Sequence, residues 1–289
     1  MNIYEKDNSV IIENIPDFLP SHTFLCGQCF RWEETEKEHF IGIASGKVVE
    51  VYTDNNNVVI KNATLDDYSN IWKKYLDIEN DYSSIKVQLS NDETLRKAIE
   101  YGWGIRILNQ DVFECLISFI ISTQNGIPRI KKIVAKLCEM YGDKIEYNGS
   151  VYYSFPKPDV LASLTAKDLE PLKAGYRTDY ILDAAKKVAF GEIDIYSLEN
   201  MSTQDARKEL LKIKGVGPKV ADCVLLFSLK KHDAFPVDVW IGRVMKKFYV
   251  DENATMKQIS AYSTENFGNL GGFAQQYLFY YARENKLID

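Results

Sequence analysis

Hydrophobic positions in the first part of the chain alternate with polar ones in short runs. Between residues 9 and 63, β-branched and aromatic residues dominate four runs: SVIIENI, HFIGIA, KVVEVY and VVIKNA. Ser45-Gly46 and the tract at 54–57 separate the last three runs with residues that favour turns. The pattern predicts a meander of antiparallel strands.

From residue 92 onward the hydrophobic positions recur at the spacing of helices. The clearest set falls at relative positions 0, 3, 4, 7 and 8 and consists of Phe113, Leu116, Ile117, Ile120 and Ile121. The same spacing starts again at Ile130 and at Ile181, and Gly191 stands where the latter helix would end. We therefore expect a series of amphipathic helices in this part of the chain.

Together these patterns predict the α+β class, with an N-terminal antiparallel β-sheet domain at 1–91 and a larger all-α domain at 92–289. The 289 residues are 46% hydrophobic and 26% charged, which is typical of a globular protein with a sizeable core. No run approaches the roughly 18 apolar residues of a membrane span, and the first ten residues lack the apolar stretch of a signal peptide. Five cysteines, an odd number, indicate a reducing compartment.

Charge is distributed unevenly along the chain. The formal net charge of −6 argues at first against a protein that binds nucleic acid. Residues 1–90, however, carry a net charge of −7, whereas residues 204–247 carry +5. A further basic stretch without acids contains Arg129, Lys131, Lys132 and Lys136. Because the charge is segregated in this way, the second part of the chain is compatible with binding a polyanionic partner.

The segment at 204–230 predicts a helix-hairpin-helix. Ser202 can cap a first helix that ends near Ile213, and Pro218 suits the first position of a second one. Between them, Gly215-Val216-Gly217 lets the backbone approach a partner closely, and amides at a helix start bind phosphate. A plain helix-turn-helix corner without any ligand is the alternative, because two glycines alone are a weak signal.

Lys219 and Asp238 follow this hairpin and suggest chemistry. Lys219 lies in the first turn of the second helix, where helix-end charge and apolar neighbours favour a neutral, nucleophilic amine. Asp238 lies in the loop at 233–240, just before another amphipathic pattern that begins at Trp240. The alternative is structural, with Asp238 as a helix cap and Lys219 as a surface lysine.

Five motifs in sequence order carry a family resemblance. They are GQCFRW, SFIISTQNGIPRI, AGYR, KGVGPKVADC followed by PVDVW, and GGFAQQYLF. In this order they resemble the helix-hairpin-helix (HhH-GPD) DNA glycosylases, and most closely the 8-oxoguanine DNA glycosylase/AP lyases. The resemblance covers most of the chain.

The resemblance implies roles for the lysine and the aspartate. Lys219 would attack the anomeric carbon of the damaged nucleoside, displace the base and form a Schiff base, after which β-elimination cuts the strand. Asp238 would support the positive charge that develops on the sugar and would help to position and activate the lysine. An amine nucleophile beside a carboxylate suits this reaction on physical grounds as well.

The resemblance also implies a pocket for the flipped base. Phe279 would stack on one face of the base, Cys223 would approach the other, and Gln275 would read its Watson–Crick edge. Gly27 would offer its carbonyl to N7–H, a donor that 8-oxoguanine has and guanine lacks. Each of these side chains could instead belong to the core or the surface.

Further matching positions concern the DNA around the lesion. Those expected at the gap and at the estranged cytosine are Gln124, Asn125, Arg129, Tyr176 and Arg177, which imply a preference for cytosine opposite the lesion. Those expected at the DNA backbone are Gly215, Val216, Gly217 and Trp240. Two of these positions depart from the family, because Gln124 replaces an asparagine at the gap and Trp240 replaces a histidine that contacts phosphate.

The expected partner is double-stranded DNA containing oxidised guanine, bound by a monomer without membrane association. We expect no cofactor and no catalytic metal, and leave open a structural monovalent or calcium ion at the hairpin. The expected location is the bacterial cytoplasm at the nucleoid, or the nucleus in a eukaryote.

Three other functions remain as alternatives. Cys26 and Cys29 form a CxxC motif of the kind found in redox proteins, although the strand-rich context is wrong for one. A non-catalytic helix-hairpin-helix protein would use Lys219 only for its charge. A glycosylase of the same superfamily could instead excise alkylated purines or adenine.

Overall fold

The N-terminal domain contains a six-stranded antiparallel sheet with the order β1-β2-β6-β5-β4-β3. The structure is a computed structural model that describes residues 2–287. The predicted meander is confirmed, with one further strand at each edge of the sheet. The strands are β1 (Ile3–Lys6), β2 (Ser9–Ile12), β3 (Trp32–Glu36), β4 (His39–Ala44), β5 (Lys47–Asp54) and β6 (Asn57–Lys61).

The buried face of the sheet packs on a short helix, α1 (Pro20–Phe24). Along β4 the side chains alternate between buried and half-buried, as expected for a strand with one face on a core. Trp32 of β3 stacks on Phe24 with ring centroids 3.9 Å apart. A Cβ at Gly42 would lie 2.2 Å from the Trp32 ring, so only glycine allows this packing.

A helical segment after β6 completes this domain and was missing from the sequence prediction. It comprises α2 (Leu65–Asp67), a π-helical stretch at Tyr68–Trp72 and α3 (Lys73–Tyr75). Tyr68, Trp72 and Leu76 lie four residues apart and are buried against the sheet core. This core contains residues up to Ile78 and, from further along the chain, Leu108. The helix α4 (Tyr82–Leu89) packs into the helical core instead.

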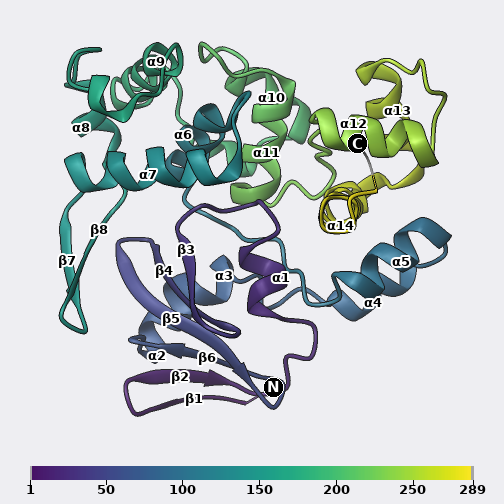
Figure 1. Ribbon diagram of the computed structural model, residues 1–289, viewed down its shortest axis with the longest axis horizontal. Helices are drawn as coiled ribbons and strands as arrows, with labels where there is room; N and C mark the ends of the chain where they lie inside the picture. The colour runs from purple at the N-terminus through teal and green to yellow at the C-terminus, as the bar shows by residue number, and fades with distance from the viewer. Residues whose placement is uncertain (1, 288–289) are drawn as a thin grey trace.

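The predicted helices of the second part of the chain are confirmed (Figure 1). α6 and α11 pack side by side at the centre of the helical core. The helices are α5 (Glu93–Tyr101), α6 (Val112–Ser122), α7 (Ile127–Tyr141), α8 (Pro158–Ala162), α9 (Arg177–Ala189), α10 (Thr203–Leu210), α11 (Pro218–Ser228), α12 (Val239–Phe248), α13 (Met256–Asn266) and α14 (Gly271–Glu284). Short 3-10 turns occur at Glu170–Leu172, Ser197–Asn200 and Gly268–Leu270.

A two-stranded hairpin of β7 (Lys144–Tyr147) and β8 (Ser150–Tyr153) interrupts the helices and was not predicted. Asn148 and Gly149 form its turn with φ angles of 48° and 73°, which is the conformation that Asn-Gly favours. The hairpin extends beside the sheet domain (Figure 1). There the Tyr147 hydroxyl donates to Glu50 at 2.9 Å, and burial together with this carboxylate raises the pKa of Tyr147 to about 12.

The loop between α1 and β3 is fixed where the two cores meet. The Gln28 side chain in this loop is fully buried. Its amide donates to the carbonyls of Thr23 and Arg106 at 2.8 and 2.7 Å, and its oxygen accepts from the Leu108 amide at 2.9 Å. The loop that carries Gly27 is therefore rigidly held by both parts of the chain.

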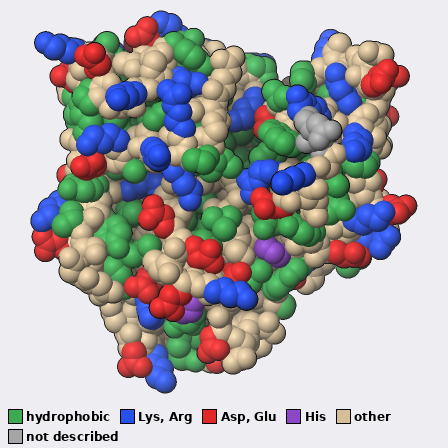
Figure 2. All heavy atoms as spheres, viewed as in Figure 1, with side chains coloured by type: hydrophobic (Ala, Val, Ile, Leu, Met, Phe, Trp, Pro, Cys, Tyr) green, Lys and Arg blue, Asp and Glu red, His purple; other side chains and the backbone are tan. Residues whose placement is uncertain are grey.

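The charge segregation expected from the sequence is visible on the surface. In Figure 2, acidic side chains spread over the sheet domain in the lower half, whereas Lys and Arg gather over the helices around α7 and α9. Within residues 2–287, no helix combines the length and the apolar character that crossing a bilayer requires.

Candidate active site

A cavity of about 890 Å³ opens between the start of α11, the start of α12, the helix α14 and the loop after α6. It gathers residues that are distant in sequence. The predicted site residues that line it are Gly27, Gln124, Asn125, Gly215, Gly217, Lys219, Cys223, Asp238, Trp240, Gln275 and Phe279. The structure therefore places the lysine, the aspartate and the four predicted base-pocket residues around one space.

Lys219 is half-buried in the wall of this cavity. Gly217 is the N-cap of α11 and Pro218 its first residue, so Lys219 lies in the first turn as predicted. Its Nζ donates to the Ser122 hydroxyl at 3.0 Å and lies 5.0 Å from the centre of the Phe119 ring. Both partners come from α6 and were missed by sequence reasoning, because only the packing of α6 on α11 brings them to the lysine.

Asp238 is the N-cap of α12, which was the structural alternative to a role in chemistry. It also faces the cavity. One oxygen, Oδ1, accepts from the Ile241 amide at 2.7 Å, which fixes the orientation of the carboxylate. A cap role and a role in chemistry are therefore compatible, since a carboxylate has two oxygens.

Cys223 lies one turn after Lys219 and is buried in the same wall. Burial raises the pKa of its thiol to about 12; Lys219 lowers it and the negative charge of Asp238 raises it. The thiol is therefore protonated and a poor nucleophile at neutral pH. Among these three groups, the Lys219 amine is therefore the candidate nucleophile.

Gly27, Phe279 and Arg283 meet at the far side of the cavity. Gly27 has a φ of +91°, and a Cβ there would lie 3.1 Å from Phe279 Cε1 and 3.2 Å from Arg283 Nη1. The positive φ thus favours glycine, and the space left for a Cβ is tight. Gln275 is buried, and its Oε1 has no hydrogen-bond partner within the described structure. A buried amide oxygen without a partner is suited to a ligand that supplies a donor.

The two cysteines of the CxxC motif give no support to the redox interpretation. Cys26 and Cys29 are free and buried. Burial raises the pKa of the Cys26 thiol to about 11 and that of Cys29 well above its usual range. A reactive dithiol needs a lowered pKa and access to solvent, and these thiols have neither.

The hairpin approaches α9 closely at Gly215. Gly215 has a φ of +82°, and a Cβ there would lie 2.2 Å from the ring of Tyr180. The first hairpin helix, α10, ends at Leu210 and not near Ile213 as predicted, because Lys212 and Ile213 donate to carbonyls three residues earlier and tighten the chain. The Lys187 ammonium donates to the Lys212 carbonyl at 2.7 Å.

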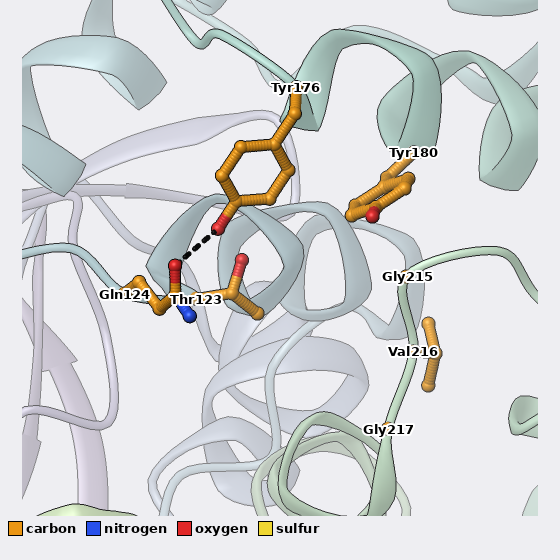
Figure 3. A pocket seen from close by; sticks show the side chains of 7 residues that line it. All are labelled: Thr123, Gln124, Tyr176, Tyr180, Gly215, Val216 and Gly217. Carbon is orange, nitrogen blue, oxygen red and sulfur yellow. Dashed lines mark hydrogen bonds between the residues drawn. The ribbon is translucent and has the colours of Figure 1, made fainter.

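A second hollow of about 510 Å³ lies beside the hairpin (Figure 3). The Tyr176 hydroxyl donates to Gln124 Oε1 at 3.3 Å across it, and the Tyr180 ring lies against the hairpin residue Gly215. Gln124 stands where the family has an asparagine. Its side chain is longer than that of asparagine and reaches Tyr176. Tyr176 itself is about half exposed.

The two arginines expected at the estranged cytosine differ in their surroundings. Arg129 is exposed at the start of α7, and one of its nitrogens donates to the Lys173 carbonyl at 3.1 Å. Arg177 is buried, and its guanidinium donates to the carbonyls of Thr123, Gln124 and Ala174. To turn toward a ligand, the exposed Arg129 would have to release the Lys173 carbonyl, whereas the buried Arg177 would have to release the carbonyls of three residues.

Asp222 gives the hairpin a pH-dependent stability. It is buried on α11 and accepts from Arg207 Nε of α10 at 2.6 Å. Burial raises its pKa to about 6, although Arg207 opposes the shift. Because the folded protein holds this proton more tightly than the unfolded chain, the stability from this group is present at low pH and is lost as pH rises through about 6.

We expect Asp222→Asn to remove this dependence. The free energy of unfolding of the natural protein minus that of Asp222→Asn should fall between about pH 4 and pH 7. Urea denaturation at several pH values measures this difference. A difference that is constant or that increases with pH would contradict the assignment.

The chain matches two family descriptions that together span most of its length. Residues 10–116 match "8-oxoguanine DNA glycosylase, N-terminal domain", and residues 117–268 match "HhH-GPD superfamily base excision DNA repair protein". The fold and the cavity thus have the features of a base excision repair glycosylase. The chain belongs to the 8-oxoguanine DNA glycosylase family of the HhH-GPD superfamily.

Individual relatives agree with this membership. A probable N-glycosylase/DNA lyase of Methanothermobacter thermautotrophicus is 33% identical over 74% of this chain and 73% of its own. The crystal structure of Clostridium acetobutylicum 8-oxoguanine glycosylase/lyase, in complex with double-stranded DNA containing cytosine opposite 8-oxoG, has a TM-score of 0.97. It is 46% identical and covers 99% of both chains. A 3-methyladenine DNA glycosylase from Archaeoglobus fulgidus shares the fold, with a TM-score of 0.77, 21% identity and coverage of 97% of this chain and 99% of its own.

Proposed function

We propose that this protein is a bifunctional DNA glycosylase and AP lyase that flips 8-oxoguanine out of duplex DNA, excises it and cuts the strand. The observation that carries the proposal is the meeting of Lys219 and Asp238 with the base-pocket residues around one cavity. Support comes from the relatives described as N-glycosylase/DNA lyase and as 8-oxoguanine glycosylase/lyase.

In the proposed reaction the neutral amine of Lys219 attacks C1′ of the flipped nucleoside. The C1′–N9 bond breaks, and the bonding electrons leave with the base, which takes up a proton. The C1′–O4′ bond then breaks as the sugar ring opens, and one proton of the amine is passed to O4′. The other proton stays on Nζ, which gives a protonated Schiff base between Nζ and C1′. Loss of a proton from C2′ then expels the 3′ phosphate by β-elimination. Hydrolysis of the Schiff base frees the enzyme.

The surroundings of Lys219 and Asp238 suit these steps. The bond to Ser122 and the Phe119 ring hold the amine at the cavity wall. The Asp238 carboxylate, oriented by the Ile241 amide, stabilises the positive charge that develops on the sugar. These are groups of the chain itself, so we propose that the reaction uses no cofactor and no catalytic metal.

The base pocket suits an oxidised purine. We propose that Phe279 and Cys223 sandwich the base, because both line the cavity and present apolar surface. The unpartnered Gln275 Oε1 would accept from an N–H on the Watson–Crick edge. The Gly27 carbonyl would accept from N7–H, which guanine lacks, so a single contact separates the lesion from the normal base.

The DNA around the lesion would be held by three groups of residues. The hairpin amides of Gly215 and Gly217 would bind phosphate, and the half-exposed Trp240 would stack beside the cavity. The corresponding role of Val216 stays a prediction, since its amide donates to the Ile213 carbonyl at 3.1 Å. Gln124, Asn125 and Tyr176 fill the gap that the flipped base leaves. Arg129 contacts the estranged cytosine, and the corresponding role of Arg177 stays a prediction, since its donors are occupied.

The substrate is tested by single-turnover excision from duplexes that differ in one base pair. We expect the fastest release for 8-oxoguanine opposite cytosine, slower release opposite adenine, and no measurable release of undamaged guanine or 3-methyladenine. Equal rates opposite cytosine and adenine would contradict the opposite-base preference. Release of 3-methyladenine at the rate of 8-oxoguanine would contradict the proposed substrate.

The remaining expectations follow from this function. The partner is double-stranded DNA, and we propose that one copy of the chain suffices, because every group used above lies in one chain. Such an enzyme works where chromosomal DNA lies, in the bacterial cytoplasm or a eukaryotic nucleus. Residues 2–287 hold no group of three or more side chains of the kind that bind metals. An ion bound by backbone carbonyls at the hairpin stays a prediction.

A further inference from the structure

Two side chains of α14 hold the loop that carries Gly27. Gln276 Nε2 donates to the Cys26 carbonyl at 2.8 Å, and Arg283 Nη2 donates to the Leu25 carbonyl at 2.6 Å. The two donors are seven residues apart, so they project from the same face of the helix two turns apart. They donate hydrogen bonds to the carbonyls of the two consecutive residues that precede Gly27.

Phe279 lies between these two donors on α14. The Arg283 guanidinium carbon is 5.4 Å from the centre of the Phe279 ring, within reach of a cation–π interaction. The same guanidinium lies against Gly27, since its Nη1 would be 3.2 Å from a Cβ there. Arg283 thus contacts both the stacking ring and the loop that carries Gly27.

The arginine at this position is not needed to fill space. Its Nη1 is buried and has no hydrogen-bond partner within the described residues, which costs free energy. A methionine or leucine would fill the same volume without that cost. An apolar residue could supply neither the bond to Leu25 nor the cation–π contacts with Phe279 and Tyr280. It would also lose the ion pair that Arg283 makes with the neighbouring Glu284 at 2.8 Å. Among these contacts, those with Leu25 and Phe279 connect Arg283 to the base pocket.

On the other side of Gly27, the buried Gln28 network holds the loop to residues 106–108. The peptide of Gly27 is therefore anchored from both directions. Recognition of N7–H through one carbonyl depends on a hydrogen bond of about 2.7–3.2 Å, so a displacement of about 1 Å would abolish it.

We propose that Gln276 and Arg283 are specificity-determining positioning residues, which set the distance between the Gly27 carbonyl and the Phe279 ring. The inference rests on the proposed function, because it assigns the reading of N7–H to Gly27. It adds that discrimination depends on α14 residues that do not touch the reacting atoms.

The test compares Gln276→Met and Arg283→Met with the natural protein in two reactions. Excision of 8-oxoguanine requires the base pocket, whereas β-elimination at a preformed abasic site does not. We expect each variant to lose about tenfold or more in excision, as expected when one hydrogen bond is lost, with less than a twofold change at the abasic site. Arg283→Lys can still donate to Leu25 and should retain most of the excision rate. Arg96→Met removes an exposed arginine paired with Glu100 and serves as the control without effect.

Binding gives a second readout that does not require turnover. In a Lys219→Gln background, we expect Gln276→Met and Arg283→Met to reduce the ratio of affinities for 8-oxoguanine and guanine duplexes by about tenfold. An equal loss in excision and in β-elimination would indicate a general structural role and overturn the inference. Unchanged discrimination in both variants would overturn it as well. If the natural protein itself does not discriminate, the proposed function fails, which is a distinguishable result.

Discussion

Lys219→Gln should abolish both base excision and strand cleavage while leaving binding to damaged duplex largely intact. We expect the single-turnover rate to fall by at least about 10³-fold, since an amide cannot form a Schiff base. The substitution preserves packing, because the glutamine amide can still donate to Ser122, the partner of the lysine. Gel-based cleavage assays and binding assays on the same 8-oxoguanine duplex measure the two effects.

Lys214→Gln is the matched control for charge. Lys214 is an exposed lysine of the same hairpin and lies outside the cavity lining. Its loss should weaken DNA binding slightly and leave the rate of chemistry at saturation unchanged. Cleavage by Lys219→Gln at the natural rate would contradict its role as the nucleophile and would favour a protein in which Lys219 only adds charge.

Asp238→Asn should have the second largest effect, with excision slowed by about 100-fold or more. The asparagine can cap α12 as the aspartate does, accepting from the Ile241 amide, so the fold is retained. The negative charge beside the developing positive charge is lost. Asp238→Ala should lose the same chemistry and in addition about 1 kcal/mol of stability, because alanine cannot cap the helix.

Urea denaturation combined with single-turnover kinetics separates the two roles of Asp238. Asp81→Asn is the control, since Asp81 caps α4 by accepting from Ser84 and lies outside the cavity lining. It should change neither rate nor stability appreciably. If Asp238→Asn excised the base at the natural rate, the carboxylate would be a helix cap and nothing more.

Much of the fold could be predicted because its elements have local signals. The strands between residues 9 and 63 and the helices from Phe113 onward have clear hydrophobic periods. The β7–β8 hairpin was missed although Asn148-Gly149 marks its turn, because each strand has only four residues and neither contains a fully buried position. The helical segment at 65–75 was missed because it consists of three consecutive pieces of three to five residues, each too short to show a hydrophobic period.

Residues of the candidate site could be predicted from the sequence only where they belong to a recognisable motif. Lys219, Asp238, Gly27 and Phe279 could be assigned by resemblance, and the structure brings them to one cavity. Ser122 could not be paired with Lys219 from sequence, because 97 residues separate them. The hydrogen bonds from α14 to the loop that carries Gly27 could not be predicted either, because they join residues about 250 positions apart. Such contacts arise from tertiary packing and leave no local pattern.

The central claim is that Lys219 forms the covalent intermediate. Borohydride added to the natural protein with a duplex containing 8-oxoguanine opposite cytosine should trap a protein–DNA adduct. Mass spectrometry of the digested adduct should then place the DNA on the peptide that contains Lys219. The absence of an adduct, or an adduct on another amine such as Lys214, would contradict the account.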